Sequence, residues 1–264
     1  MTENRLVVTE IVGKVATVRL NRPEVRNAFN QAMIQQITEV FENLAHNTGI
    51  RVIVLRGNGK TFCAGADLEY MQQVAGFSPD ENVADGMLLA RMFEAIAMST
   101  VPVVGIVHGA SMGGANGILA ACDIVLAEND TVFAFSEVKL GIVPAVISPF
   151  VLRKLQPGAA RELMLTGRRF SAHEAVAAGL INYSLDSDSV ETKLTEIIHE
   201  FYTASPQAVA LCRKLIAGVS GNLYNDNLGQ MTANYLAEAR ASVEGKEGLN
   251  AFLQKRKPGW TEQH

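Results

Sequence analysis

The sequence predicts an α/β fold, because short β-rich runs alternate with helical runs up to about residue 190. Two cycles of this kind stand out. A helix is expected over 31–46 before a strand over 51–57, and a second helix over 86–99 before a strand over 103–109. With 264 residues, of which 48% are hydrophobic and 19% charged, the chain can bury one large core, or one core with a small appendage.

A β-hairpin is expected at the start of the chain, since residues 5–12 and 14–20 are β-rich and flank Gly13. Residues 21–30 then form a polar turn. The helix over 31–46 follows, and its apolar side chains share one face. That face consists of Met33, Ile37, Val40, Phe41, Leu44 and Ala45.

Two glycine-rich turns follow the strands over 51–57 and 103–109. The first is TFCAGADL over 61–68 and the second is GASMGGANG over 109–117. Each leads towards a helix, and Asp67 suits the N-cap or first turn of the first one. Glycine and alanine leave room for a ligand to approach the backbone. Two backbone N–H groups that meet at one oxygen would form an oxyanion hole.

The second turn opens a helix that runs through Cys122, and strands are expected over 123–127 and 132–135. Beyond about residue 190 no strong strand run remains. Helices are expected there over 190–203, 206–217, 226–243 and 247–256. The sequence thus predicts a core of residues 1–190 followed by a helical region of residues 191–264.

Composition and charge exclude several classes of function. The net charge is −4, and no basic stripe is present, so we expect no nucleic-acid partner. Apolar stretches are too short to span a membrane, and the N-terminus lacks the features of a signal peptide. The cysteines have no metal-ligand spacing and suit reduced thiols in a cytoplasmic protein. They are Cys63, Cys122 and Cys212.

Glu137 is the candidate acid/base group. It directly follows an apolar strand and precedes Val138, Leu140 and Ile142. Apolar surroundings disfavour the charged form of a carboxylate and raise its pKa towards neutrality, which suits a proton donor or acceptor. An exposed glutamate at a strand end is the alternative interpretation.

Several segments in order carry a resemblance to a known family. NRPEVRNAFN, FCAGADL, VHGASMGGANGILAACDIVLA, FSEVKLGIVP and AAGLIN resemble the crotonase, or enoyl-CoA hydratase/isomerase, superfamily over nearly the whole chain. The resemblance implies a spiral core of repeated ββα units and a helical C-terminal region that builds homotrimers, often paired as homohexamers. It also implies an acyl-CoA thioester as substrate, with no cofactor besides the coenzyme A of that substrate, and no metal.

The resemblance assigns roles residue by residue. Ala66 and Gly114 match the positions whose N–H groups bind the thioester oxygen, and Glu137 matches a catalytic glutamate. Nine other positions match those that line the substrate and its coenzyme A. They are Arg26, Ala64, Asp67, Leu68, Gly113, Asn116, Gly117, Phe252 and Lys255. Two of them, Phe252 and Lys255, match positions that sometimes reach the coenzyme A bound to a neighbouring subunit.

One departure from the family pattern leaves the reaction open. Hydratases with two carboxylates carry their other glutamate where this chain has Gly117. The segment VPAVISPF over 143–150 resembles a bacterial subgroup assigned to methylglutaconyl-CoA or related branched enoyl-CoA hydration. We therefore expect an enoyl-CoA hydratase that uses Glu137. A Δ3-Δ2 enoyl-CoA isomerase with one base is the alternative, and a non-catalytic acyl-CoA binder is a third.

Overall fold

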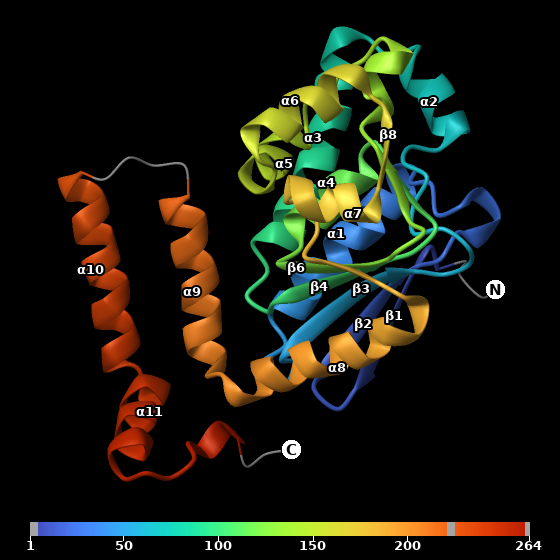
Figure 1. Ribbon diagram of the computed structural model, residues 1–264. Helices are drawn as coiled ribbons and strands as arrows, with labels where there is room; N and C mark the ends of the chain where they lie inside the picture. Colours follow the sequence, from blue (N-terminus) through green and yellow to red (C-terminus); the bar gives the residue numbers. More distant parts are fainter. Residues whose placement is uncertain (1–4, 221–224, 262–264) are drawn as a thin grey trace.

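The computed structural model describes residues 5–220 and 225–261, which form two sheets surrounded by helices and a helical C-terminal end (Figure 1). The strands are β1 (Val7–Val12), β2 (Val15–Leu20), β3 (Val52–Gly57), β4 (Val103–Val107), β5 (Ala110–Met112), β6 (Ile124–Glu128), β7 (Val132–Ala134), β8 (Arg169–Ser171) and β9 (Tyr183–Leu185). The α-helices are α1 (Gln31–Ala45), α2 (Leu68–Val74), α3 (Pro79–Ala97), α4 (Ala115–Ala121), α5 (Ser148–Lys154), α6 (Pro157–Thr166), α7 (Ala172–Ala178), α8 (Ser187–Thr203), α9 (Pro206–Val219), α10 (Asp226–Ala241) and α11 (Val243–Leu253). Short 3-10 helices are η1 (Pro23–Val25), η2 (Ser136–Leu140) and η3 (Gly259–Thr261).

The larger sheet has the strand order β1-β2-β3-β4-β6-β9. The hairpin of β1 and β2 is antiparallel, as the sequence predicts, and every later pair in this sheet is parallel. Parallel neighbours need a crossover connection, and here helices supply it. The α/β prediction is therefore confirmed.

Both faces of the larger sheet are buried, which explains why β3 reads as the unbroken apolar run VIVL. Its Ile53 and Leu55 belong to the main core. Its Val52 and Val54 belong to a second cluster, to which α8 contributes from the opposite face. The site described below lies on the side of the main core.

A smaller sheet with the order β5-β7-β8 positions the second glycine-rich turn. β5 is part of that turn, so the expectation that 109–117 is a turn throughout is wrong at Ala110–Met112. An isolated parallel bridge joins Cys63 to Ser111 and so ties the first glycine-rich turn to β5. Residues far apart in the sequence meet at this point.

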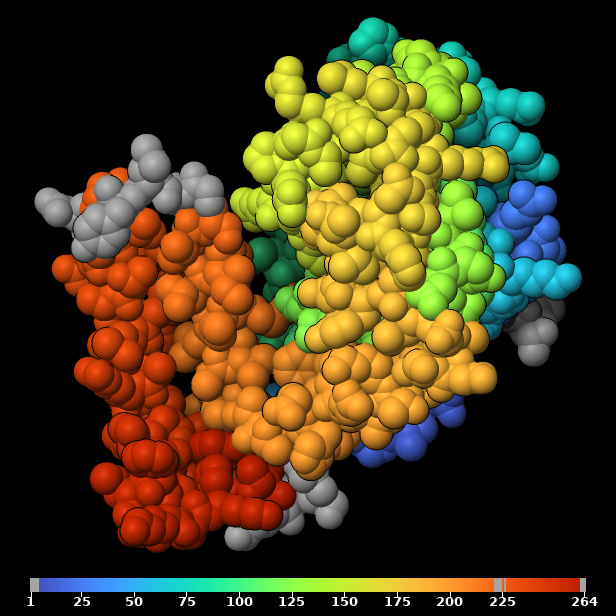
Figure 2. All heavy atoms as spheres, in the orientation of Figure 1, coloured from blue at the N-terminus to red at the C-terminus, as the bar shows by residue number. Residues whose placement is uncertain are grey.

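From residue 187 onward, the described part of the chain is built mainly of four α-helices, as predicted. α8 packs against the larger sheet, whereas α9, α10 and α11 extend away from it as a C-terminal arm (Figures 1 and 2). Within the part of the chain that the structure describes, no helix has both the length and the hydropathy to cross a bilayer. The division into residues 1–190 and 191–264, like a cytoplasmic location, stays a prediction.

Candidate active site

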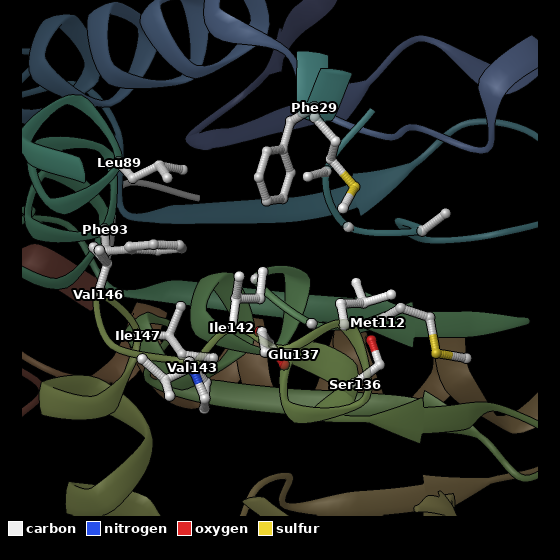
Figure 3. A pocket seen from close by; sticks show the side chains of 18 residues that line it. Phe29, Leu89, Phe93, Met112, Ser136, Glu137, Ile142, Val143, Val146 and Ile147 are labelled. Carbon is white, nitrogen blue, oxygen red and sulfur yellow. The ribbon is translucent and has the colours of Figure 1, made fainter. Parts of the chain in front are cut away.

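A cavity of about 230 Å³ lies beside the two glycine-rich turns (Figure 3). Backbone of both turns, apolar side chains of α3 and the segment that follows β7 form its walls. The lining residues are Phe29, Ala64, Gly65, Ala66, Met71, Leu89, Phe93, Met112, Gly113, Gly114, Ser136, Glu137, Leu140, Ile142, Val143, Pro144, Val146 and Ile147.

The two turns are joined through their backbones. The Cys63 N–H donates to the Ala110 carbonyl at 3.2 Å, and the Met112 N–H donates to the Cys63 carbonyl at 3.1 Å. Gly65 has a φ of +91°, and a Cβ on it would lie 2.8 Å from the Met112 carbonyl oxygen. Glycine is therefore required here, because any side chain would push the turns apart.

Asn27 holds the first glycine-rich turn in place through side-chain hydrogen bonds. It is fully buried, and its side-chain Nδ2 donates to the carbonyls of Asn58 and Thr61 at 2.8 Å each. Its Oδ1 accepts from the Arg22 N–H at 2.9 Å. The backbone of Asn27 has a φ of +55°, a conformation that asparagine tolerates better than most residues.

We expect Asn27→Ala to lower the free energy of unfolding by about 2–4 kcal/mol, because it leaves buried backbone groups without partners. Chemical denaturation followed by circular dichroism measures this loss. Asn47→Ala is the matched control, since Asn47 is exposed and makes a single local bond to the Gly49 N–H. Equal stability of the two variants would show that Asn27 does not hold the turn.

Ala66 and Gly114 offer backbone N–H groups to the cavity. Around Ala66, the Phe29 N–H donates to Gly65 and the Asp67 N–H donates to Phe29, so the Ala66 amide faces away from Phe29. Among residues 5–220 and 225–261, neither the Ala66 nor the Gly114 N–H has a protein acceptor. Both residues line the cavity, so both donors remain available to a bound oxygen.

Glu137 projects into the same cavity from η2 (Figure 3). A Cβ on Gly113 would lie 3.2 Å from its Oε1, so the carboxyl group reaches the second glycine-rich turn. Its Oε2 is buried and has no hydrogen-bond partner in the described residues. Burial raises the pKa of this carboxyl group, as its apolar neighbours predict, although its own backbone N–H partly opposes the shift.

This raised pKa makes stability depend on pH. Between the ordinary glutamate pKa and the raised one, the folded protein binds more protons than the unfolded chain, so rising pH costs stability. Glutamine at position 137 cannot ionise and escapes that cost. We expect the Tm of Glu137→Gln minus that of the wild type to grow as pH rises from about 4 towards the raised pKa, and to stay constant above it. Calorimetry across both ranges checks it, and a difference that is constant throughout would contradict a raised pKa.

Five of the residues singled out from the sequence meet in the cavity. They are Ala64, Ala66, Gly113, Gly114 and Glu137. Glu137 is the one ionisable side chain among the lining residues that the structure describes. In the same part of the chain, no group of three or more His, Cys, Asp or Glu side chains could hold a metal ion.

Near the first turn, three of the remaining residues lie outside the cavity lining. Arg26 is exposed and contributes its carbonyl, which accepts from the Ala64 N–H at 2.9 Å. Asp67 is the N-cap of α2, as the sequence indicates, and forms an ion pair with Arg22 at 2.9 Å. Leu68 is 77% exposed.

Asn116 and Gly117 lie behind the cavity wall. Asn116 is fully buried, and its Nδ2 donates to the Ala134 carbonyl at 2.8 Å. Gly117 packs against Ile147 and Phe93, with no space beside it for another group. Phe252 in α11 and Lys255 just after it are exposed, and neither lines the cavity of its own chain.

Sequence reasoning missed much of the apolar wall, above all Phe29, Leu89, Phe93 and Ile147. Phe29 stands within NRPEVRNAFN, one of the segments that carry the family resemblance, so its proximity to the site had a sequence signal. Ile147 stands within VPAVISPF, the segment that resembles the bacterial subgroup, so it had a sequence signal as well. Leu89 and Phe93 are apolar residues among many, and nothing in their local pattern indicates a site.

Comparison with known proteins gives concordant results. The family model described as enoyl-CoA hydratase/isomerase matches residues 10–263. The enoyl-CoA hydratase ACTT6 of Alternaria alternata is 32% identical over 92% of this chain and 80% of its own length. The short-chain-enoyl-CoA hydratase of Clostridium acetobutylicum is 29% identical over 95% of both chains. A crystal structure of an enoyl-CoA hydratase from Shewanella pealeana superimposes with a TM-score of 0.93 at 36% identity, covering 98% of this chain and 97% of that one.

Proposed function

The chain belongs to the enoyl-CoA hydratase/isomerase family, and we propose that it hydrates the α,β double bond of an enoyl-CoA thioester with Glu137 as its acid/base. The observation that carries this proposal is that a carboxyl group and two backbone N–H donors meet at one apolar cavity. Within the described residues, Oε2 of Glu137 and the N–H groups of Ala66 and Gly114 have no protein partner, and all three residues line this cavity.

The reaction needs a stabilised enolate and one proton donor. Water adds to Cβ, the double-bond electrons move to the thioester oxygen, and the N–H groups of Ala66 and Gly114 donate to that oxygen. The protonated Glu137 carboxyl group gives its proton to Cα, and the proton released by the added water returns to Glu137. Burial raises the pKa of this carboxyl group and so favours its protonated form, which suits the donation of a proton to Cα.

The acyl chain that suits this cavity is apolar. Apart from Glu137, the lining consists of glycine, serine and apolar residues. A branched, methylglutaconyl-like substrate stays a prediction, and its second carboxylate would find no Lys or Arg among the lining residues described. Burying such a charge without a partner costs several kcal/mol.

A Δ3-Δ2 isomerase is the second candidate, and the packing around Gly117 favours it. Ile147 and Phe93 fill the space beside that residue, and the lining residues that the structure describes include no second carboxylate to hold the attacking water. An isomerase needs none, because one carboxylate takes a proton from Cα of a 3-enoyl-CoA and returns it at Cγ.

The purified protein should be incubated with crotonyl-CoA, 3-methylglutaconyl-CoA and 3-hexenoyl-CoA in water enriched in ¹⁸O. Hydration predicts loss of the conjugated thioester absorbance of a 2-enoyl substrate and one ¹⁸O in its product. Gain of that absorbance from 3-hexenoyl-CoA without ¹⁸O would instead identify the isomerase. Binding of all three without turnover by folded protein would leave a non-catalytic acyl-CoA binder.

A homotrimer or homohexamer also belongs to this proposal. Its support is the set of large apolar side chains that the C-terminal arm leaves exposed, which are Ile216, Leu236, Val243, Leu249, Phe252 and Leu253. Such exposure is typical of a surface that another protein covers. Light scattering of the purified protein measures the mass, and a monomer would contradict the assembly.

A further inference from the structure

Gly117, the third residue of α4, has no side chain and so leaves a gap, which the side chains of Ile147 and Phe93 fill. A Cβ built on Gly117 would lie 2.3 Å from Cγ2 of Ile147 and 2.9 Å from Cε1 of Phe93. Carbon atoms in contact are about 3.5–4.0 Å apart, so no residue but glycine fits without displacing this pair. We call the gap beside Gly117, which Ile147 and Phe93 fill, the Gly117 notch.

The two side chains that fill the notch belong to the cavity wall as well as to the core. Ile147 and Phe93 both line the cavity, yet they are only 3% and 1% exposed. Phe93 is supported by the ring of Phe150, with 5.8 Å between the centroids. The Ile147 carbonyl accepts from the Val151 N–H at 3.0 Å, which fixes its backbone at the start of α5. These contacts hold Phe93 and Ile147 in place in the cavity wall.

The wall closes one end of the cavity. Figure 3 shows Phe93 and Leu89 at one side of Glu137, with Met112 and Ser136 at the other. Coenzyme A is large and charged, so it has to leave the cavity towards solvent. The buried, apolar end is then left for the part of the acyl chain beyond Cβ.

We propose that Ile147, seated in the Gly117 notch beside Phe93, sets the length limit of the acyl chain. The inference rests on the proposed function, because it takes an enoyl-CoA as substrate. Gly117 acts through Ile147, since its missing side chain lets Ile147 withdraw from the cavity. Ile147 is thus a specificity-determining residue and Gly117 a positioning residue.

Size exchange between the two positions tests this. Kinetics with trans-2-enoyl-CoAs of increasing length give the ratio of kcat/KM for a long chain over that for crotonyl-CoA. One methylene in an apolar pocket changes such ratios by about 10–200-fold, so Ile147→Ala should raise the ratio at least about tenfold. Ile147→Val should raise it less. Gly117→Ala should lower it, because the new Cβ drives Ile147 into the cavity.

The double variant Gly117→Ala/Ile147→Ala is expected to return the ratio towards the wild-type value, since the added methyl group occupies space that the isoleucine vacates. Ile197→Ala is the matched control, because Ile197 is also buried but packs on the α8 face of the sheet. Its ratio should equal that of the wild type. An unchanged ratio in folded Ile147→Ala and Ile147→Val would overturn the proposal.

Binding separates this inference from the proposed reaction. Calorimetric titration with butyryl-CoA and decanoyl-CoA measures the length limit without turnover. If Ile147→Ala shifts the ratio of the two dissociation constants towards decanoyl-CoA while no enoyl-CoA is hydrated, the proposed function fails and the length limit stands. If hydration occurs but neither ratio moves, the length limit fails alone.

Discussion

Glu137→Gln is expected to lower kcat for the enoyl-CoA substrate by about 10²–10⁴-fold, the range that a positioned acid/base group contributes. Glutamine has nearly the shape of glutamate but cannot exchange a proton. The affinity for a saturated acyl-CoA should stay nearly unchanged, because the N–H donors and the apolar wall remain. Steady-state kinetics and calorimetric titration measure the two effects separately.

Glu69→Gln provides the control for this change. Glu69 lies in the first turn of α2, next to the cavity in sequence but exposed and outside its lining. Glu69→Gln also replaces a carboxyl group by an amide, and this variant should keep full turnover. Turnover of Glu137→Gln equal to that of Glu69→Gln would remove Glu137 from the mechanism.

Gly114→Pro is expected to cost about 10²–10³-fold in kcat relative to Gly114→Ala, the effect of one lost oxyanion donor. Proline has no N–H, and the φ of −54° at Gly114 is one that proline adopts. Both substitutions place a Cβ against the ring of Phe29, at 2.8 Å before any adjustment. The comparison of the two variants therefore cancels the effect of the Cβ, and what remains is the replacement of the N–H group by the ring Cδ of proline.

Circular dichroism and thermal unfolding check that both Gly114 variants are folded. The expected pattern is slow turnover by the proline variant alone, with the larger effect on kcat, because the oxygen carries full charge only as the enolate forms. Equal kcat in both variants would exclude the Gly114 N–H as a donor.

Local patterns predicted the elements that are long or flanked by clear turns. The hairpin of β1 and β2, the buried strand β3 and the amphipathic helix α1 all follow from periodicity and turn residues. β8 has only three residues, with one buried between two exposed, which is too short for a periodic signal. Its pairing with β7 decides its structure.

The start of α7 carries a recognisable sequence signal. Ser171 caps this helix and forms a capping box with Glu174, in which each side chain bonds the other residue's N–H. A serine followed three residues later by glutamate indicates a helix start from sequence alone.

The candidate site divides in the same way. Glu137 and the two glycine-rich turns were predicted because their residues are contiguous in the chain and carry recognisable motifs. The meeting of Gly117 with Phe93 and Ile147 was not predictable, because packing of α3 and the start of α5 against α4 creates it. Apolar side chains that fit a notch have no sequence signature apart from their partners.

Both candidate reactions rest on one claim, that Glu137 moves a proton at Cα of a thioester whose oxygen is held by the Ala66 and Gly114 N–H groups. In heavy water, the Cα hydrogens of butyryl-CoA exchange for deuterium when this step occurs, and mass spectrometry measures the exchange. The measurement applies whether the full reaction is hydration or isomerisation. The wild type is predicted to catalyse the exchange and Glu137→Gln to leave it at the uncatalysed rate. Equal exchange by the two proteins, or none above the uncatalysed rate by the wild type, would contradict the claim.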